Sequence, residues 1–329
     1  MFRNHKRIAA IILSFILALP TLTSCGEAGT DRVRIAIQPS AAFIPLFVAK
    51  EKGWIEEALR PYNVAVTWNM FESGPPMNDS LLAGDSDIGV IGDVPVVTVC
   101  APGNGVQVVA IAAQAADSYA ILVPADSDIV SADDLTGKRV AATFGSTAHN
   151  MVEKYIYTAG LGINNIDLVN IAAGDAASVL SKGQAEAVSI WEPSVTRLTY
   201  DGSIKILAVG SEVGLAGTNA MVARKKFAHG NPEVMTAIIA QYKRAADELP
   251  TLDRETLDAV AKDLNLTYDQ LMSVIPKFNY SVAITDEDIS ALNDTIRFLN
   301  ENKIMRSKYN ISESTDKSYY KGNQDEQNR

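Results

Sequence analysis

The chain has 329 residues and carries 29 lysines and arginines against 39 aspartates and glutamates, a formal net charge of −10. This acidic balance argues against nucleic acid as a partner, because a polyanion is bound by basic surface. The length is sufficient for two domains and a sizeable hydrophobic core.

The first 24 residues have the pattern of a bacterial lipoprotein signal peptide. Basic residues precede an apolar run at residues 8–19, which is too short to span a bilayer. The sequence Leu22-Thr23-Ser24-Cys25 then has the form of a lipobox. We expect cleavage before Cys25, a lipid on that cysteine, a short linker to residue 32 and attachment to the extracytoplasmic face of the cell membrane. The alternative is an ordinary secretory signal with a stray cysteine.

The chain contains two cysteines. If Cys25 carries lipid, Cys100 has no partner within the chain, so no disulfide framework is expected. No Cys/His cluster has the spacing of a zinc site, and we expect neither a metal nor a cofactor. Cys100 lies in an apolar run at residues 94–101 that favours a buried helix, so its thiol is predicted to lie in the core.

Beyond the leader, short apolar strands alternate with helical segments, which is the pattern of an α/β protein. The first set of predicted strands covers residues 33–37, 64–68, 87–91 and 106–112. The second set covers residues 119–123, 140–144, 166–171, 187–191 and 204–209, and a short strand at 220–223 leads back.

Helices are predicted between and after these strands. A helix at residues 44–59 buries an apolar face, and a second begins at Asn231-Pro232 and carries an apolar stripe to Leu249. A capping box at residues 267–270 starts another helix, and the last helix carries the stripe Ile289 to Leu299. Residues 312–329 are polar and predict a frayed tail.

Two crossings, near residues 116–119 and 213–223, join the two sets of strands. We therefore predict two βα lobes around a central cleft, with residues 33–117 and 224–311 in lobe 1 and residues 118–223 in lobe 2. In open α/β sheets the ligand lies beyond the carboxyl ends of the strands, so both sets of strand ends can face the cleft.

The stretch from Arg139 to Val152 predicts a strand, a glycine turn and a hydroxyl-rich helix start. Gly145 permits the tight turn, and Ser146 or Thr147 can cap the helix. Free backbone N–H groups and the positive end of the helix dipole suit an anion at this point. The alternative is that both hydroxyls only cap the helix.

Several motifs, taken in order, resemble the aliphatic-sulfonate and taurine-binding proteins of ABC importers. They are Pro45 to Trp54, Phe71-x-Ser73-Gly74, Leu82 to Gly89, Gly92-Asp93-x-Pro95, Leu135 to Ala141, Gly145 to His149, Ile190-Trp191-Glu192-Pro193, Arg224 to Ala228 and Pro232-Glu233-Val234. The resemblance covers residues 33 to 300 and extends to nitrate- and thiamine-precursor-binding proteins.

This resemblance implies a type II periplasmic-binding-protein fold, an α/β fold whose two lobes close on one small molecule. The implied partners are a small organosulfonate such as an alkanesulfonate or taurine, an ABC permease and its ATPase, and the chain is expected to act as a monomer. Nitrate, a pyrimidine precursor of thiamine or another small aromatic acid remain alternative ligands.

The family's binding loops match five segments, and each follows a predicted strand. They are Gln38 to Phe43, Ser73-Gly74, Gly92-Asp93, Gly145 to His149, and Trp191-Glu192. The resemblance therefore implies ligand contacts at Gln38, Phe43, Ser73, Gly74, Gly92, Asp93, Gly145, Ser146, Thr147, His149, Trp191 and Glu192.

Some of these residues have a second interpretation. Glu192 would repel a plain anion but pair with an amine, which suits taurine, or it could cap the helix that starts at Pro193. Capping is favoured for Asp93. Trp191 and His149 could line the cleft or pack, and Phe43 could face the cleft or form a hydrophobic staple.

Catalysis has little support in the sequence. There is no nucleophile elbow, metal-ligand spacing or phosphate loop. The related pyrimidine synthases carry a cysteine cluster, which this chain lacks. A non-enzymatic alternative is a surface sensor built from the same lobes.

Overall fold

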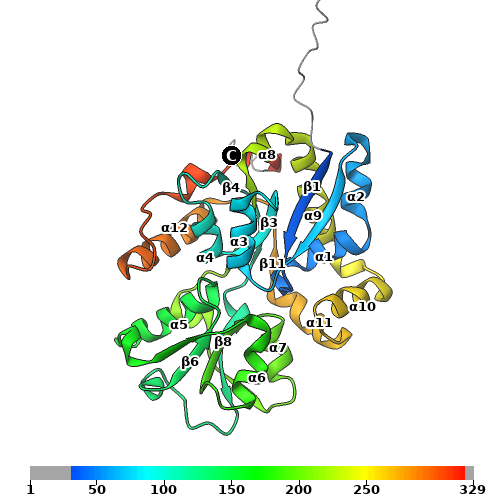
Figure 1. The fold of residues 1–329 in the computed structure, drawn as a ribbon. Helices are drawn as coiled ribbons and strands as arrows, with labels where there is room; N and C mark the ends of the chain where they lie inside the picture. The colour runs from blue at the N-terminus through cyan, green and yellow to red at the C-terminus, as the bar shows by residue number, and fades with distance from the viewer. Residues whose placement is uncertain (1–30, 323–329) are drawn as a thin grey trace, which may run out of the picture.

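The computed structural model describes residues 31–322, and the predicted signal peptide and Cys25 lie outside this range. The described residues form two lobes, one above the other in Figure 1, each built on its own sheet. No helix among them is long and apolar enough to cross a membrane.

Lobe 1 contains a six-stranded sheet in the order β11-β4-β10-β3-β1-β2. Its strands are β1 (Arg32–Ile37), β2 (Ala65–Met70), β3 (Ile88–Gly92), β4 (Val106–Gln114), β10 (Thr218–Arg224) and β11 (Asn279–Tyr280). Strands β1, β2 and β3 are parallel, whereas β10 is antiparallel to both of its neighbours. The carboxyl ends of the three parallel strands therefore meet at one edge.

Helices cover both faces of the lobe 1 sheet (Figure 1). One face carries α1 (Ile44–Glu51), α2 (Trp54–Leu59), α9 (Pro232–Glu248), α10 (Arg254–Asp263) and α11 (Tyr268–Val274). The other carries α3 (Gly74–Ala83), α4 (Asp93–Val99) and α12 (Asp286–Glu301). Cys100 is fully buried with a free thiol in the second of these cores, as predicted.

Lobe 2 contains a five-stranded sheet in the order β7-β6-β8-β5-β9. Its strands are β5 (Tyr119–Pro124), β6 (Arg139–Ala142), β7 (Asp167–Asn170), β8 (Ala187–Trp191) and β9 (Ile204–Val209). Helices α5 (Thr147–Thr158), α6 (Ala176–Ser181) and α7 (Ser194–Thr199) pack on it around one apolar core.

The two crossings between the lobes lie side by side. Ala115 N–H donates to the Gly217 carbonyl at 3.2 Å. Gly217 has φ of 66°, and a Cβ there would sit 2.2 Å from the Ala115 carbonyl oxygen, so only glycine fits. This paired segment joins the two lobes.

Three details differ from the sequence-based prediction. Strand β10 belongs to the lobe 1 sheet, so the return crossing ends before Thr218 rather than at residue 223. The expected helix at residues 44–59 is two helices, because Gly53 between them is left-handed. Residues 312–320 are not frayed: Asp316 N–H bonds the Val108 carbonyl, and the buried Tyr319 packs in the lobe 1 core.

Candidate functional site

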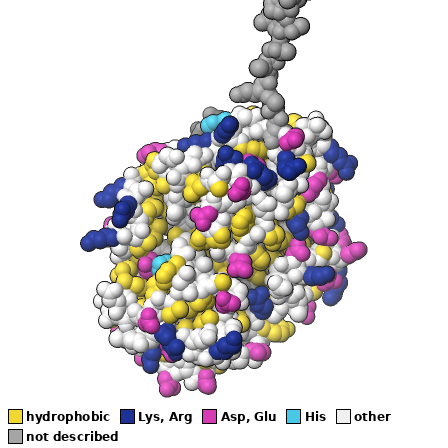
Figure 2. Space-filling model, viewed as in Figure 1, with side chains coloured by type: hydrophobic (Ala, Val, Ile, Leu, Met, Phe, Trp, Pro, Cys, Tyr) yellow, Lys and Arg dark blue, Asp and Glu magenta, His cyan; other side chains and the backbone are white. Residues whose placement is uncertain are grey.

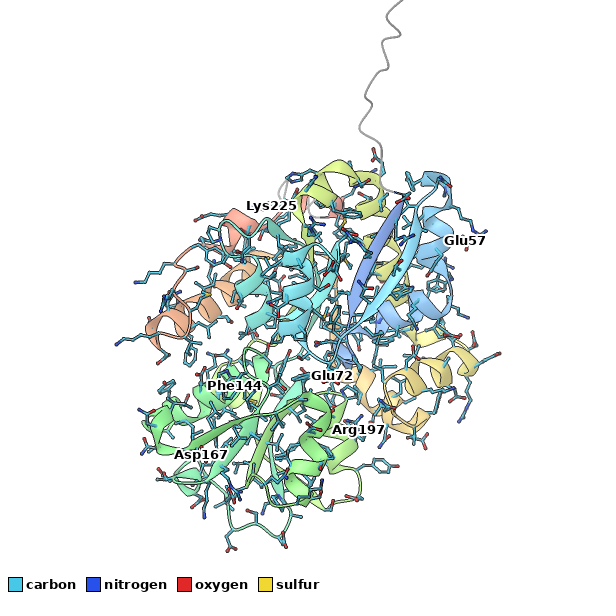
Figure 3. All side chains as sticks on the ribbon, viewed as in Figure 1. Glu57, Glu72, Phe144, Asp167, Arg197 and Lys225 are labelled. Carbon is cyan, nitrogen blue, oxygen red and sulfur yellow. The ribbon has the colours of Figure 1, made fainter. Side chains whose placement is uncertain are left out.

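Two neighbouring cavities lie between the lobes. The larger has a volume of about 600 Å³ and is lined by the segment after β2, including Phe71 and Ser73, and by Thr143 and Phe144 of lobe 2. The smaller, of about 140 Å³, lies between Pro39 and Leu264 of lobe 1 and Trp191, Pro193 and Arg197 of lobe 2. Glu72 lines both cavities, and Figure 3 shows it where the lobes meet.

The start of α5 has the predicted strand, turn and capped helix. Gly145 has φ of 76°, and Ser146 is the N-cap residue. The Ser146 hydroxyl accepts the His149 N–H at 3.3 Å and donates to the Thr143 carbonyl at 2.6 Å. The capping interpretation of Ser146 is therefore confirmed, and its hydroxyl already has two partners.

Thr147 reaches across the cleft. Its hydroxyl donates to Asp93 Oδ1 at 2.5 Å, and Asp93 belongs to α4 of lobe 1. The same carboxylate accepts the Val94 N–H at 2.7 Å and the Thr295 hydroxyl at 3.0 Å. Burial raises the pKa of Asp93, although these hydrogen bonds act in the opposite direction. Gly92 allows this approach, because a Cβ there would lie 2.6 Å from Thr147 Oγ1.

Glu192 makes a second contact between the lobes. Its carboxylate accepts the Thr196 N–H at 3.0 Å and the Thr196 hydroxyl at 2.9 Å, so it caps α7. Lys277 Nζ, from lobe 1, lies 2.6 Å from Glu192 Oε1. The side chain of Glu192 is fully buried, and the amine that it pairs with in this structure belongs to the protein.

The remaining predicted contacts divide into cavity residues and packed residues. Ser73 and Trp191 line the cavities, whereas Phe43 is fully buried in the core of lobe 1. Gln38 is buried in the loop after β1, and its Oε1 atom has no hydrogen-bond partner in the structure. His149 stacks on Phe144, with 4.7 Å between ring centroids.

Gly74 has a packing role. A Cβ at Gly74 would lie 2.4 Å from Pro95 Cγ, so α3 and α4 approach each other closely at this point. Because both helices begin at the cleft edge, this contact fixes how the Ser73 and Asp93 loops sit beside one another.

The residues of the site that the sequence analysis missed include Glu72, Phe144, Arg197 and Lys277. Glu72 and Phe144 adjoin recognised loops and could have been found there. Arg197 lies one turn beyond Trp191-Glu192-Pro193, where a single basic residue gives a weak signal. Lys277 has no local signal, since its partner lies 85 residues away.

Comparison with known proteins gives a consistent result. The family model described as NMT1/THI5 like matches residues 40–251. A Bacillus subtilis protein, provisionally named as an aliphatic sulfonates-binding protein, is 28% identical over 94% of this chain and 95% of its own length. The taurine-binding periplasmic protein of Escherichia coli is 30% identical over 71% of this chain and 68% of its own length.

A solved structure has the same fold. The alkanesulfonate-binding protein SsuA of Xanthomonas axonopodis pv. citri, bound to MOPS, superposes with a TM-score of 0.81 at 24% identity. The match covers 88% of this chain and all of that one. This confirms the predicted two-lobed periplasmic-binding-protein fold.

Proposed function

Because the chain belongs to the NMT1/THI5-like family, we propose that it is an extracytoplasmic solute receptor that captures a small organosulfonate between its lobes and delivers it to an ABC permease. The observation that carries this proposal is the pair of cavities at the strand ends, each lined by both lobes. The names of the relatives support sulfonates as the ligand class. These relatives are named as binding proteins, which supports binding without catalysis.

The ligand would enter when the lobes part. Opening requires loss of the hydrogen bond from Thr147 to Asp93 and of the ion pair between Lys277 and Glu192. The paired crossings at Ala115 and Gly217 would remain and act as the hinge. A ligand that touches both lobes favours the shut state, because it gains contacts there that the open state lacks.

We propose that the five matched loops surround the ligand and that the start of α5 contributes backbone N–H groups. The first N–H groups of a helix have no intrahelical acceptor, so they can donate to a polar group of the ligand. The hydroxyls of Ser146 and Thr147 have partners in the shut structure, and Thr147 becomes free only if the lobes separate. On this account Glu192 does not select an amine-bearing ligand, because it caps α7 and pairs with Lys277.

We also propose that the chain is a monomer held on the membrane by a lipid on Cys25. The support is the sequence Leu22-Thr23-Ser24-Cys25, since acyl chains add about 0.8 kcal/mol per buried CH₂ group. Mass spectrometry of the membrane-bound protein should find a diacylated or triacylated Cys25, and Cys25→Ala should release the protein or leave it unprocessed. An unmodified Cys25 in the membrane fraction would remove the anchor from the proposal.

A thermal-shift screen of residues 26–329 tests the ligand class. Alkanesulfonates and taurine should raise the melting temperature, because a ligand at 100 times its dissociation constant adds about 2.7 kcal/mol of stability. Nitrate and pyrimidines serve as competing classes in the same screen. Stabilisation by one of these and not by any sulfonate would reassign the ligand.

A further inference from the structure

We propose that Arg197 contacts the acidic end of the ligand and that Glu72 contacts an amine, so that the cleft selects a sulfonate with an amine near the acid and an apolar group beyond it. This inference rests on the proposed function, and it names the substrate class and two specificity-determining residues of the same cleft. The proposed ligand has three sections, an acid, an amine and an apolar group, and a different part of the cleft would contact each.

Arg197 is the residue that would bind the acid group of the ligand. Within residues 31–322, the other half-buried arginines each pair with a carboxylate: Arg34 and Arg224 with Asp87, and Arg139 with Glu186. Arg197 is also half-buried, but its side chain donates a hydrogen bond from Nη2 to the Ser194 hydroxyl at 2.9 Å, and it has no ion pair among these residues.

The surroundings of Arg197 favour an anion from outside the chain. Burial lowers its pKa, and no neighbouring carboxylate raises it again. A guanidinium that is partly removed from water without an opposite charge beside it is unfavourable, and a bound anion would compensate it. The planar fork of N–H donors can bind two oxygens of one acid group side by side, which a sulfonate provides.

Glu72 is the residue that would bind the amine of the ligand. It lies on lobe 1, in the loop between β2 and α3, and lines the same cavity as Arg197 of lobe 2 (Figure 3). The two side chains make no ion pair, so each keeps its charge available to a ligand between them. A carboxylate beside the acid pocket repels a second anionic group and attracts an ammonium.

The larger cavity is the region that would hold the apolar group of the ligand. It also includes Glu72, which Figure 3 shows between Phe144 and Arg197, and its walls include the apolar side chains of Met70, Phe71, Phe144 and Ile171. Met70 and Phe144 are 51% and 40% exposed, large fractions for such side chains at the mouth of a cleft. Hydrophobic side chains gather on this face of the molecule in Figure 2. An apolar group attached to the amine would cover them.

The test is calorimetry with three probes: taurine, 2-(cyclohexylamino)ethanesulfonate and 2-cyclohexylethanesulfonate. The wild-type protein should bind the second probe at least tenfold more tightly than either of the others, because only this probe has all three groups. Arg197→Gln should weaken binding of all three by tenfold or more. Glu72→Gln should weaken only the two amine-bearing probes. Arg60→Gln and Glu57→Gln, exposed changes on lobe 1 outside the cavities, are the matched controls.

The outcomes separate the two proposals. If the wild-type protein binds none of the probes, the proposed function fails as well. If it binds them and Arg197→Gln changes no affinity, only the present inference is overturned. Equal losses for all three probes at Glu72→Gln overturn the amine contact. Should Arg197→Gln not fold, Arg197→Lys carries the test, because it keeps the charge and loses the fork, and an unchanged affinity then overturns the assignment.

Discussion

Lys277 and Glu192 lie on opposite lobes, and 2.6 Å separates Lys277 Nζ from Glu192 Oε1. Lys277 also donates to the Thr196 hydroxyl at 3.0 Å, so one amine holds the start of α7 against the segment after α11. Because this contact joins the two lobes, it stabilises their shut arrangement. It therefore sets part of the balance between the open and shut states.

Removal of this amine should favour the open state. The Lys277 side chain is 41% exposed, so the ion pair is screened and about 1 kcal/mol is a reasonable contribution. Lys277→Ala should therefore shift the balance toward the open state by roughly fivefold, since 1.4 kcal/mol is tenfold. Small-angle scattering of the ligand-free variant should give a larger radius of gyration than the wild type. Lys243→Ala, which removes an exposed ion pair within lobe 1, is the control, and an equal radius for all three proteins would contradict the prediction.

Glu192→Gln should weaken binding of taurine and of a matched alkanesulfonate by the same factor. The carboxylate caps α7 and pairs with Lys277, so its loss affects the shut state rather than one ligand's amine. Calorimetry with both ligands measures the two factors. A loss confined to taurine would show that Glu192 contacts the ligand amine after all.

Glu153 should make stability depend on pH. Burial raises its pKa from 4.5 to about 7. A raised folded-state pKa means that the stabilising contribution is complete below the unfolded pKa and is lost as pH rises to the folded pKa. The wild-type protein should therefore lose stability relative to Glu153→Gln between pH 4.5 and 7, by up to about 3 kcal/mol at 1.36 kcal/mol per pH unit.

Urea unfolding of the two proteins across this pH range measures the Glu153 contribution. Glu233→Gln, an exposed change at the start of α9, should show no such pH-dependent difference from the wild type. A constant difference between wild type and Glu153→Gln at every pH would mean that Glu153 keeps an ordinary pKa.

Gly74→Ala should destabilise lobe 1. The new Cβ would lie 2.4 Å from Pro95 Cγ, and relief of such overpacking typically costs about 1–3 kcal/mol. Gly230→Ala is the matched control, since its Cβ would meet no atom within 4 Å. Thermal unfolding of both variants decides the point, and equal melting temperatures would show that α3 and α4 separate easily.

Much of the fold followed from local patterns, because a buried strand or an amphipathic helix leaves its period in the sequence. The strand before Gly145 and the cap at Ser146 are examples. The features of the fold that local patterns did not predict depend on contacts between distant segments. The period of β10 indicates a strand but not which sheet it joins, and its antiparallel place between β3 and β4 depends on the crossing at Gly217.

The candidate site likewise has features that local sequence patterns predicted and features that depend on distant segments. The loops that follow strands were identifiable, since any parallel strand delivers its next residues to the sheet edge. The partners of those residues were not. Thr147 bonds Asp93, 54 residues away, and Glu192 pairs with a lysine on the other lobe, and neither relationship leaves a spacing that a single sequence can display.

The measurement that tests the central claim most directly is a calorimetric titration of residues 26–329 with propanesulfonate and with nitrate. The account predicts one propanesulfonate bound per chain, with tighter binding than nitrate. It also predicts that taurine competes for the same site. Saturable binding of nitrate with no heat from propanesulfonate or taurine would contradict the assignment of this chain as an organosulfonate receptor.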